Sequence, residues 1–405
     1  MKRKAVQAGK IYTTQFWLIC ASSYFFFASF NMIIPELPAY LTSLGGEKYK
    51  GLIISLFALT ALLARPFSGT MADRFGRVPV MITGSAVCLV MGLLYPLFTT
   101  VWGFLLLRLI HGFSTGFTPT GQAAYLSDVI PAARRGEAMG LLGTAGTIGM
   151  ASGPAIGGLI ANIFSIDFLF YCSSVMALAS LTVLAGVHET LKVRTKFSAS
   201  IFRISRKDLF ERRVLLPCIV MVLSVYAYGT MLTLIPDFGD QVGIRNKGLL
   251  FTYFTLSSLL VRLLAGRASD LYGRRKVLVV SVGMLVIAMI IISQGQTPRD
   301  LIIGICLYGL SHGMTSPTLL AWATDLSDPE HKGRGVASLY IFMELGIGVG
   351  AFVSGILFNI EPDNFRLPFI ACIALSSAAF LVLLAAGWRK SARAAQSESS
   401  PPIQY

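Results

Sequence analysis

A single carboxylate, Glu344, lies within a stretch of apolar and small residues, LYIFMELGIGVGAFVSGILF, that runs from Leu339 to Phe358. An ionised carboxylate is costly in apolar surroundings, so its presence there calls for a specific reason. One interpretation is a group that takes up and releases a proton during a reaction cycle. The alternative is a neutral glutamate that packs between two helices and accepts a hydrogen bond from Tyr340, one helical turn earlier.

Four other residues that could handle charge also stand in apolar runs. Arg108 in LLLRLIHGFSTG would need an acidic or carbonyl partner if it is buried, because a guanidinium keeps its charge. An imidazole such as that of His111 or His312 can relay protons, but it can also form a neutral hydrogen bond between helices. A further acid, Glu36, stands between the two prolines of IIPELP.

The composition places these residues in a membrane protein. The 405 residues are 54% hydrophobic and only 13% charged, whereas a soluble domain carries about 25% charged residues. Each of twelve apolar runs is long enough to cross a bilayer as a helix. We therefore expect an all-α membrane protein with spans near 15–38, 48–68, 78–97, 102–124, 137–162, 167–187, 214–236, 248–268, 277–295, 301–323, 335–359 and 366–388.

The net charge of +14 is unevenly distributed over the loops. With twelve spans, 27 Lys and Arg residues lie on the side of the two termini, six lie on the other side and Arg108 lies within a span. This asymmetry predicts that both termini are cytoplasmic. A basic face beside anionic lipid accounts for the charge, so we expect the lipid bilayer, and no nucleic acid, as the partner of this face.

Two patterns typical of enzymes lack the context that they require. GFSTG at 112–116 matches a nucleophile elbow and GIGVGA at 346–351 resembles a dinucleotide-binding loop, but both patterns need a preceding strand and both lie in apolar spans. The six cysteines fall singly in separate spans, without metal-ligand spacing. We therefore expect no enzymatic activity, no metal site and no cofactor.

The chain divides into two similar halves. The polar segment 188–213 separates six spans from six, which predicts bundles at 1–187 and 214–388, a cytoplasmic linker at 188–213 and a disordered cytoplasmic tail at 389–405. RPFSGTMADRFGR from Arg65 aligns with RLLAGRASDLYGR from Arg262 at an offset of 197, which Asp128 and Asp325 share. At an offset of 201, IIPELP aligns with LIPDFG, and His111 with His312. Six spans per half predict a parallel repeat.

The repeated motif follows the second span of each half on the cytoplasmic side. Its glycines would permit close approach or sharp turns, Asp73 would cap the next helix, and its arginines would pair with acids. Because the motif occurs at equivalent positions in both halves, we interpret it as a cytoplasmic gate and not as loop charge that only sets the membrane topology. The predicted gate residues are Gly69, Asp73, Arg74, Gly76, Arg77, Gly266, Asp270, Gly273 and Arg274.

These residues resemble the inner-loop signature of the major facilitator superfamily, G-x-L-A-D-R-x-G-R-K. Met71 and Val78 replace its Leu and Lys in the first half, and the match is looser in the second half. The resemblance covers essentially the whole chain through the plan of six plus six spans. It implies two bundles that rock around a central site, with this loop as a gate whose ion pairs break and re-form.

A second motif lies in the span 137–162, where GMASGPAIGG matches the family signature G-x-x-x-G-P-x-x-G-G at every fixed position. That signature resembles the drug:proton antiporter branch. Small residues four apart permit close helix contact, so a packing face without a transport role is the alternative. The motif residues are Gly149, Gly153, Pro154, Gly157 and Gly158.

The resemblance also bears on coupling to protons. The Arg108-x-x-x-Gly112 spacing resembles a family motif whose arginine is associated with proton coupling, although a structural tie between helices is the alternative. Members of the branch often carry an acid in the first span, where this chain has Asn31, so Glu344 could take that role. Candidate proton-coupling residues are therefore Glu344, Arg108 and Glu36. Family geometry gives as cavity candidates Phe27, Asn31, His111, Tyr228, His312 and Tyr340.

Together, these features predict a monomeric multi-pass carrier of the bacterial inner membrane. We expect it to export small lipophilic compounds or drugs against proton entry by alternating access. The alternatives are a proton-coupled importer or metabolite exporter of the same superfamily, or a membrane sensor that does not transport.

Overall fold

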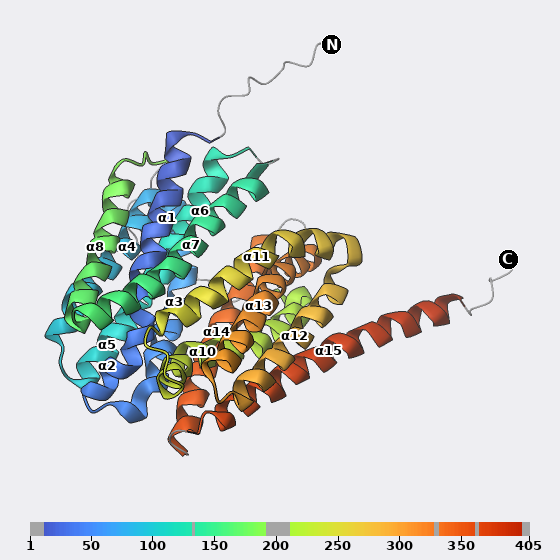
Figure 1. Ribbon diagram of the computed structural model, residues 1–405. Coiled ribbons are helices and arrows are strands. Elements are labelled where there is room, and N and C mark those ends of the chain that lie inside the picture. Colours follow the sequence, from blue (N-terminus) through green and yellow to red (C-terminus); the bar gives the residue numbers. More distant parts are fainter. Residues whose placement is uncertain (1–11, 132–133, 192–210, 328–331, 361–363, 399–405) are drawn as a thin grey trace, which may run out of the picture. The chain divides into compact units, whose positions relative to one another are not determined.

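The computed structural model describes residues 12–131, 134–191, 211–327, 332–360 and 364–398, which form helices without any strand (Figure 1). The helices are α1 (Thr14–Ile33), α2 (Leu37–Ser43), α3 (Lys50–Arg74), α4 (Arg77–Leu94), α5 (Val101–His111), α6 (Phe113–Val129), α7 (Arg135–Ile163), α8 (Ile166–Ala185), α10 (Leu215–Gln241), α11 (Gly248–Tyr272), α12 (Arg274–Gln294), α13 (Pro298–Leu326), α14 (Lys332–Ile360) and α15 (Arg366–Glu398).

These helices coincide with the predicted spans. The first span is α1 continued into α2, and the fourth is α5 and α6, which are separated at Gly112. Within the described residues, eight segments are long and apolar enough to cross a membrane by length and composition alone. The remaining four are the α5–α6 pair, α7, α11 and α13, whose glycine, hydroxyl and charged residues lower the mean hydropathy. The expectation of an all-α membrane protein is confirmed.

The chain separates into two compact units. Unit 1 comprises residues 1–47, 56–204 and 246–252, and unit 2 comprises residues 48–55, 205–245 and 253–405. The first residues of α3 thus belong to unit 2 and those of α11 to unit 1, although the rest of each helix belongs to the opposite unit.

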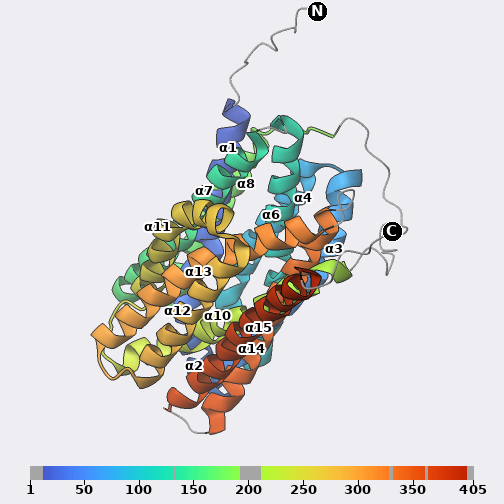
Figure 2. The ribbon, with the colours of Figure 1, turned by 90° about the vertical axis from the view of Figure 1, so that its right-hand side faces the viewer.

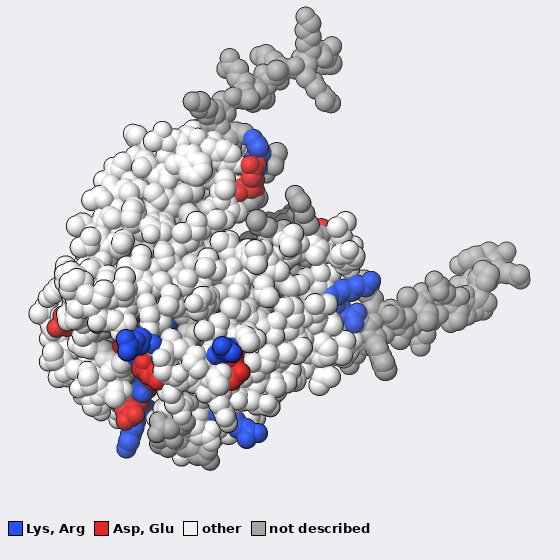
Figure 3. Space-filling model, viewed as in Figure 1, with Lys and Arg blue, Asp and Glu red and all other residues white. Residues whose placement is uncertain are grey.

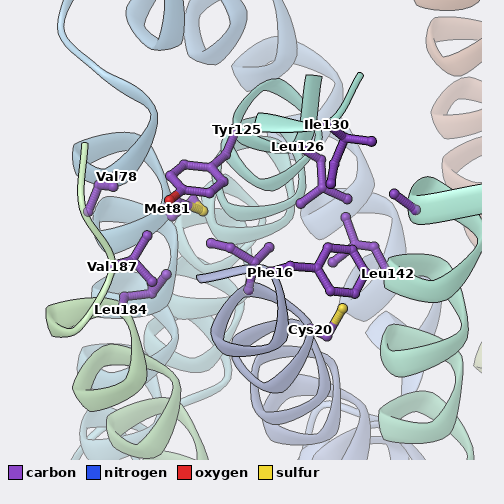
Figure 4. Close-up of a cluster of buried hydrophobic side chains, with 12 residues drawn as sticks. Phe16, Cys20, Val78, Met81, Tyr125, Leu126, Ile130, Leu142, Leu184 and Val187 are labelled. Atoms are coloured by element: carbon purple, nitrogen blue, oxygen red, sulfur yellow. The ribbon is translucent and has the colours of Figure 1, made fainter. Parts of the chain in front are cut away.

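Each unit has an apolar core at the end of its helices that we predict to be cytoplasmic, called the inner end below. In unit 1, side chains from α1, α4, α6, α7 and α8 point into one shared cluster (Figure 4). In unit 2, residues of α10, α12, α13, α14 and α15 form a corresponding cluster. Close helix contacts join α1 to α7 and α10 to α14, which lie side by side in both ribbon views (Figure 2).

Charged side chains are sparse on the face shown in Figure 3, where they form small separate groups. Large apolar side chains are exposed along the helices instead, as with Leu260 at 74% and Leu264 at 67%. A surface of this kind suits lipid, because a soluble monomer rarely exposes extended apolar patches.

One boundary differs from the predictions. Helix α15 continues to Glu398, so the tail that we expected to be disordered from residue 389 is helical over its first part. Its sequence SARAAQSE contains three alanines, which favour the continuation of a helix. Most of the predicted linker, 192–210, lies outside the described residues, as does the end of the tail, 399–405.

Candidate functional site

The inner loops of the two units hold the same arrangement of three charged residues. In unit 1, Arg77 Nη1 lies 2.6 Å from Asp73 Oδ1, and its Nε donates to Asp128 Oδ2 at 3.0 Å. In unit 2, Arg274 pairs with Asp270 and its Nε donates to Asp325 Oδ2 at 2.9 Å. All three residues correspond at the offset of 197. The repeated motif therefore builds an arginine held between two aspartates in each unit, which we call the inner triads.

A glycine at the turn before each triad arginine has a positive φ angle. The φ angle is 134° at Gly76 and 89° at Gly273, in a region that residues other than glycine rarely adopt. These two glycines therefore make the sharp turns that the motif predicted. At Gly69 an added Cβ would meet no atom of the described residues within 4 Å, so these residues show no close approach there. The other motif residues lie in helices, Arg74 at the end of α3 and Gly266 in α11.

The expectation that Asp73 caps the next helix is wrong. Asp73 lies within α3, so its carboxylate pairs with Arg77 and does not reach the free amides of α4. Glu189, which follows α8, accepts from the backbone N–H of Arg77 at 3.0 Å and of Val78 at 3.1 Å. Sequence reasoning missed Glu189, because nothing in its surroundings marks it as a cap. Asp128 and Asp325 carried a signal in their shared offset.

The glycine motif forms the surface of α7 that contacts α1. A Cβ at Gly149 would clash with Tyr24 O, one at Gly153 would lie 2.7 Å from Ala28 O, and one at Gly157 would clash with Met32 O. Within the same helix, Pro154 removes one backbone donor. Gly158 faces away from α1, against Asn246 and Gly248. The motif therefore brings two helices into backbone contact, as the packing interpretation requires.

Unit 2 repeats this contact between α14 and α10. Gly346 lies against the backbone of Val222, where an added Cβ would be 2.8 Å from the carbonyl oxygen, and Gly350 lies against Tyr226 O. Both glycines correspond to motif glycines at the offset of 197, although no proline accompanies them. Close backbone packing is thus a property of both halves, and the proline distinguishes α7.

Replacing Gly157 with alanine is expected to separate α1 from α7. The new methyl group would overlap a backbone oxygen, which cannot move as a flexible side chain would, so we expect a loss of about 1–3 kcal/mol in stability. The thermal unfolding midpoint of the purified protein measures the effect. Gly143→Ala is the matched control on α7, because its Cβ would meet nothing within 4 Å; equal midpoints for the two variants would contradict the contact.

Arg108 lies in α5, 1% exposed, within an aromatic network of unit 1. Its guanidinium carbon is 4.6 Å from the ring centroid of Phe57, and its Nη1 donates to the Tyr95 hydroxyl at 3.3 Å. The same hydroxyl is 2.9 Å from His111 Nδ1. The two predicted residues Arg108 and His111 therefore both contact the hydroxyl of Tyr95. The ring of Phe57 also stabilises the positive charge of Arg108, because the face of an aromatic ring attracts a cation.

Glu344 lies in unit 2, 8% exposed, among polar aromatic residues. It interacts electrostatically with the phenol of Tyr228, whose ring stacks on His312 at a centroid distance of 5.4 Å and an interplanar angle of 17°. Tyr340 and His312 both interact electrostatically with Arg262 of α11. The predicted residues Tyr228 and His312 are therefore in contact, with Glu344 acting electrostatically on the former and Arg262, which sequence reasoning did not select, on the latter.

A small cavity of about 10 Å³ lies beside His312. It is lined in part by Ser224 and Tyr308, whose hydroxyls make no hydrogen bond to any other described residue. A space of this size holds at most one water molecule. The surroundings of His312 thus include polar groups that are open to further hydrogen bonding.

The remaining candidates in α1 have local partners. Asn31 donates from its side chain to Phe27 O at 2.8 Å, and the Phe27 ring lies against Gly146 of α7. The third coupling candidate is Glu36, whose carboxylate lies 3.8 Å from Lys247 Nζ. Of the coupling candidates, Arg108 and Glu36 belong to unit 1 and Glu344 belongs to unit 2.

Comparison with known proteins agrees with this arrangement. Residues 17–247 and 241–404 match the sequence model of the Major Facilitator Superfamily. The multi-drug resistance efflux pump PmrA of Streptococcus pneumoniae is 30% identical over 340 residues, which cover 80% of this chain and 84% of that protein. The multidrug resistance protein MdtG of Salmonella dublin is 27% identical over 333 residues, 79% and 82% of the two chains.

Solved structures share the fold at lower sequence identity. The human organic anion transporter MFSD10 superimposes with a TM-score of 0.70 and 19% identity, covering 91% of this chain and 98% of that one. The nucleoside transporter NupG gives a TM-score of 0.75 and 14% identity, with coverage of 92% and 99%. The family model spans both halves and the fold agrees, so the chain belongs to the major facilitator superfamily of multi-pass membrane transporters.

Proposed function

We propose that this chain is a secondary transporter of the bacterial inner membrane that exports small lipophilic compounds in exchange for protons. The observation that carries the proposal is its similarity to PmrA and MdtG over about four fifths of its length, since both relatives are described as multidrug resistance proteins. The intact glycine–proline motif of α7 and the apolar, aromatic surroundings of the buried polar residues agree with lipophilic substrates.

In the proposed cycle, Glu344 takes up a proton from the outer side, substrate leaves, and deprotonation on the inner side resets the site. The bundles 1–187 and 214–388 alternate around a central site, and the inner triads act as the cytoplasmic gate. Both termini are cytoplasmic and the protein acts as a monomer. The support for Glu344 is its burial and its electrostatic interaction with Tyr228, because ionisable residues within membranes usually serve transport or proton transfer.

Two measurements test the proposal. A host that lacks its own efflux pumps, expressing this chain, should gain resistance to lipophilic compounds when challenged with a panel of cationic, neutral and anionic members. Proteoliposomes should then move an active compound when a pH gradient is imposed and stop when a protonophore removes it. Uptake driven by an inward proton gradient would instead favour an importer, and failure to move any compound of the panel would favour a sensor.

A further inference from the structure

The small cavity of unit 2 is bounded by residues of α10, α12 and α13. Its volume is about 10 Å³, and its lining includes Ser224, Tyr308, Ser311 and Thr315, four residues that carry hydroxyl groups, together with His312. All of its described lining residues belong to unit 2, so the cavity lies within one compact unit. A concentration of polar groups inside a membrane bundle needs a reason, because hydrocarbon offers such groups no partner.

Two of these hydroxyl groups are buried without a partner. Ser224 is 4% exposed and Tyr308 is 1% exposed, and neither hydroxyl makes a hydrogen bond to any described residue. Folded proteins rarely leave a buried hydroxyl unsatisfied, since removing it from water without a replacement bond is costly. The two groups come from different helices, α10 and α13, and line the same space. One small ligand in that space would therefore serve both.

Two other hydroxyl groups at the cavity can each accept a further hydrogen bond. Ser311 Oγ donates to Ser281 O at 2.7 Å. Thr315 Oγ1 lies 2.9 Å from Ser281 Oγ and 2.9 Å from Ser311 O. A hydroxyl group has two lone pairs besides its single proton, so both oxygens remain able to accept after these contacts. The cavity thus presents both donors and acceptors to a ligand.

The corresponding region of unit 1 is joined by direct contacts between hydroxyl groups. Thr118 corresponds to Thr315 at the offset of 197, and its Oγ1 lies 3.4 Å from Ser85 Oγ. Ser85 Oγ lies 3.2 Å from Ser180 Oγ, which lies 3.0 Å from Ser22 Oγ. These contacts connect α6, α4, α8 and α1 without a gap. In unit 2 the hydroxyl contacts described for α13 reach α12, and the serine hydroxyl of α10 at the cavity is left over.

The repeated histidines differ in the same way. His111 has two side-chain partners, since its Nδ1 lies 2.9 Å from the Tyr95 hydroxyl and its Nε2 lies 3.4 Å from Cys88 Sγ. Its counterpart His312 stacks on Tyr228 and lines the cavity, but makes no hydrogen bond to any described residue. A neutral imidazole has one N–H donor and one acceptor nitrogen. Hydrogen-bonding groups that are satisfied by side chains in unit 1 are therefore open at the cavity of unit 2.

We propose that this cavity binds one resident water molecule, which hydrogen-bonds to Ser224 and Tyr308 and joins α10 to α13. The space admits a single water, and its lining offers more than the two to four polar partners that a buried water uses. A metal cation is disfavoured, because no described lining residue is acidic and the positive charge of Arg262 acts on His312. The water takes the place of the direct contacts of unit 1 and hydrates His312 inside the bundle.

X-ray radiolytic labelling of the protein in nanodiscs tests this site, because hydroxyl radicals formed from a bound water oxidise the side chains beside it. Met221 and Met289 are both buried in unit 2, at 2% and 0% exposed. Met221 lines the cavity, whereas Met289 is not among its described lining residues. Mass spectrometry should show oxidation of Met221 at least about fivefold faster than that of Met289. Equal rates for the two methionines would overturn the water site.

Two variants of α10 connect this signal to the serine hydroxyl. Ser224→Val replaces the hydroxyl with methyl groups that fill the cavity, so the oxidation rate of Met221 should fall to that of Met289. Thr233→Val is the matched control, because Thr233 is also buried on α10 and its hydroxyl donates to Gly229 O of the same helix at 2.9 Å. This control should keep the wild-type rate. An unchanged rate in Ser224→Val, or an equal fall in Thr233→Val, would contradict the proposal.

A density map of the wild-type protein gives an independent answer, which holds even if Ser224→Val does not fold. A map that resolves ordered waters should show one peak within hydrogen-bonding distance of Ser224 Oγ and Tyr308 Oη. A clearly resolved cavity without such a peak would also overturn the proposal. Neither measurement requires transport, so this inference and the proposed export function can fail separately.

Discussion

Glu344→Gln is expected to abolish proton-driven efflux while the protein still reaches the membrane at the wild-type level. Glutamine keeps the size and hydrogen-bonding capacity of a neutral glutamate but cannot release a proton. If Glu344 is the proton switch, net efflux should fall by roughly a hundredfold or more, the scale associated with removing a required proton-transfer group. Efflux of a fluorescent lipophilic cation from inverted membrane vesicles, driven by an imposed pH gradient, measures this loss.

Substrate exchange separates the proton role from a general failure. Exchange of labelled for unlabelled compound across proteoliposomes needs no net release of protons, so Glu344→Gln should retain it. Tyr340→Phe is the matched control, because it removes a hydroxyl one helical turn from Glu344 on α14 and leaves the carboxyl group in place. Wild-type efflux by Glu344→Gln would reject the proton switch and leave the packing interpretation.

Arg108→Met is expected to remove most of the efflux activity without unfolding the protein. An apolar side chain of similar length can replace a buried cation at little cost when no partner is left charged and unpaired. The Tyr95 hydroxyl would still contact His111, at 2.9 Å, and Phe57 would pack against the methionine. If Arg108 takes part in coupling, we expect a loss of efflux on the order of tenfold or more, because a fixed buried charge acts electrostatically on nearby proton transfer.

The unfolding midpoint must be measured beside efflux for this variant. Leu106→Met on the same helix is the control, since that side chain is 50% exposed and should tolerate the change in both assays. A large drop in the midpoint of Arg108→Met would identify the arginine as a structural tie between helices. Wild-type efflux with an unchanged midpoint would remove Arg108 from the coupling candidates.

The ion pairs at the two ends of the helices differ in which halves of the chain they join. At the inner ends, each triad is closed within one half of the chain, as with Arg77 and Asp128. At the outer ends, each pair joins one half to the other, as with Lys50 and Asp237.

Several features of this protein follow from its sequence alone. Hydropathy identifies the chain as a membrane protein and gives the positions of its helices. A segment that crosses a bilayer must be long and apolar, regardless of which other helices it packs against. The close packing of α7 follows from Gly149, Gly153 and Gly157, since residues four apart share a helix face. The internal repeat made the inner triads predictable in outline, because identical residues recurred in register.

The tertiary structure decided which distant groups meet. Glu189 caps a helix that begins 112 residues earlier, Lys50 pairs with an acid 187 residues later, and Arg108 rests on the ring of Phe57. Hydropathy and spacing describe one helix at a time and are silent on these partners. Which side chains face each other depends on the rotation and depth of each helix against its neighbours, and packing sets these only when all the helices are assembled.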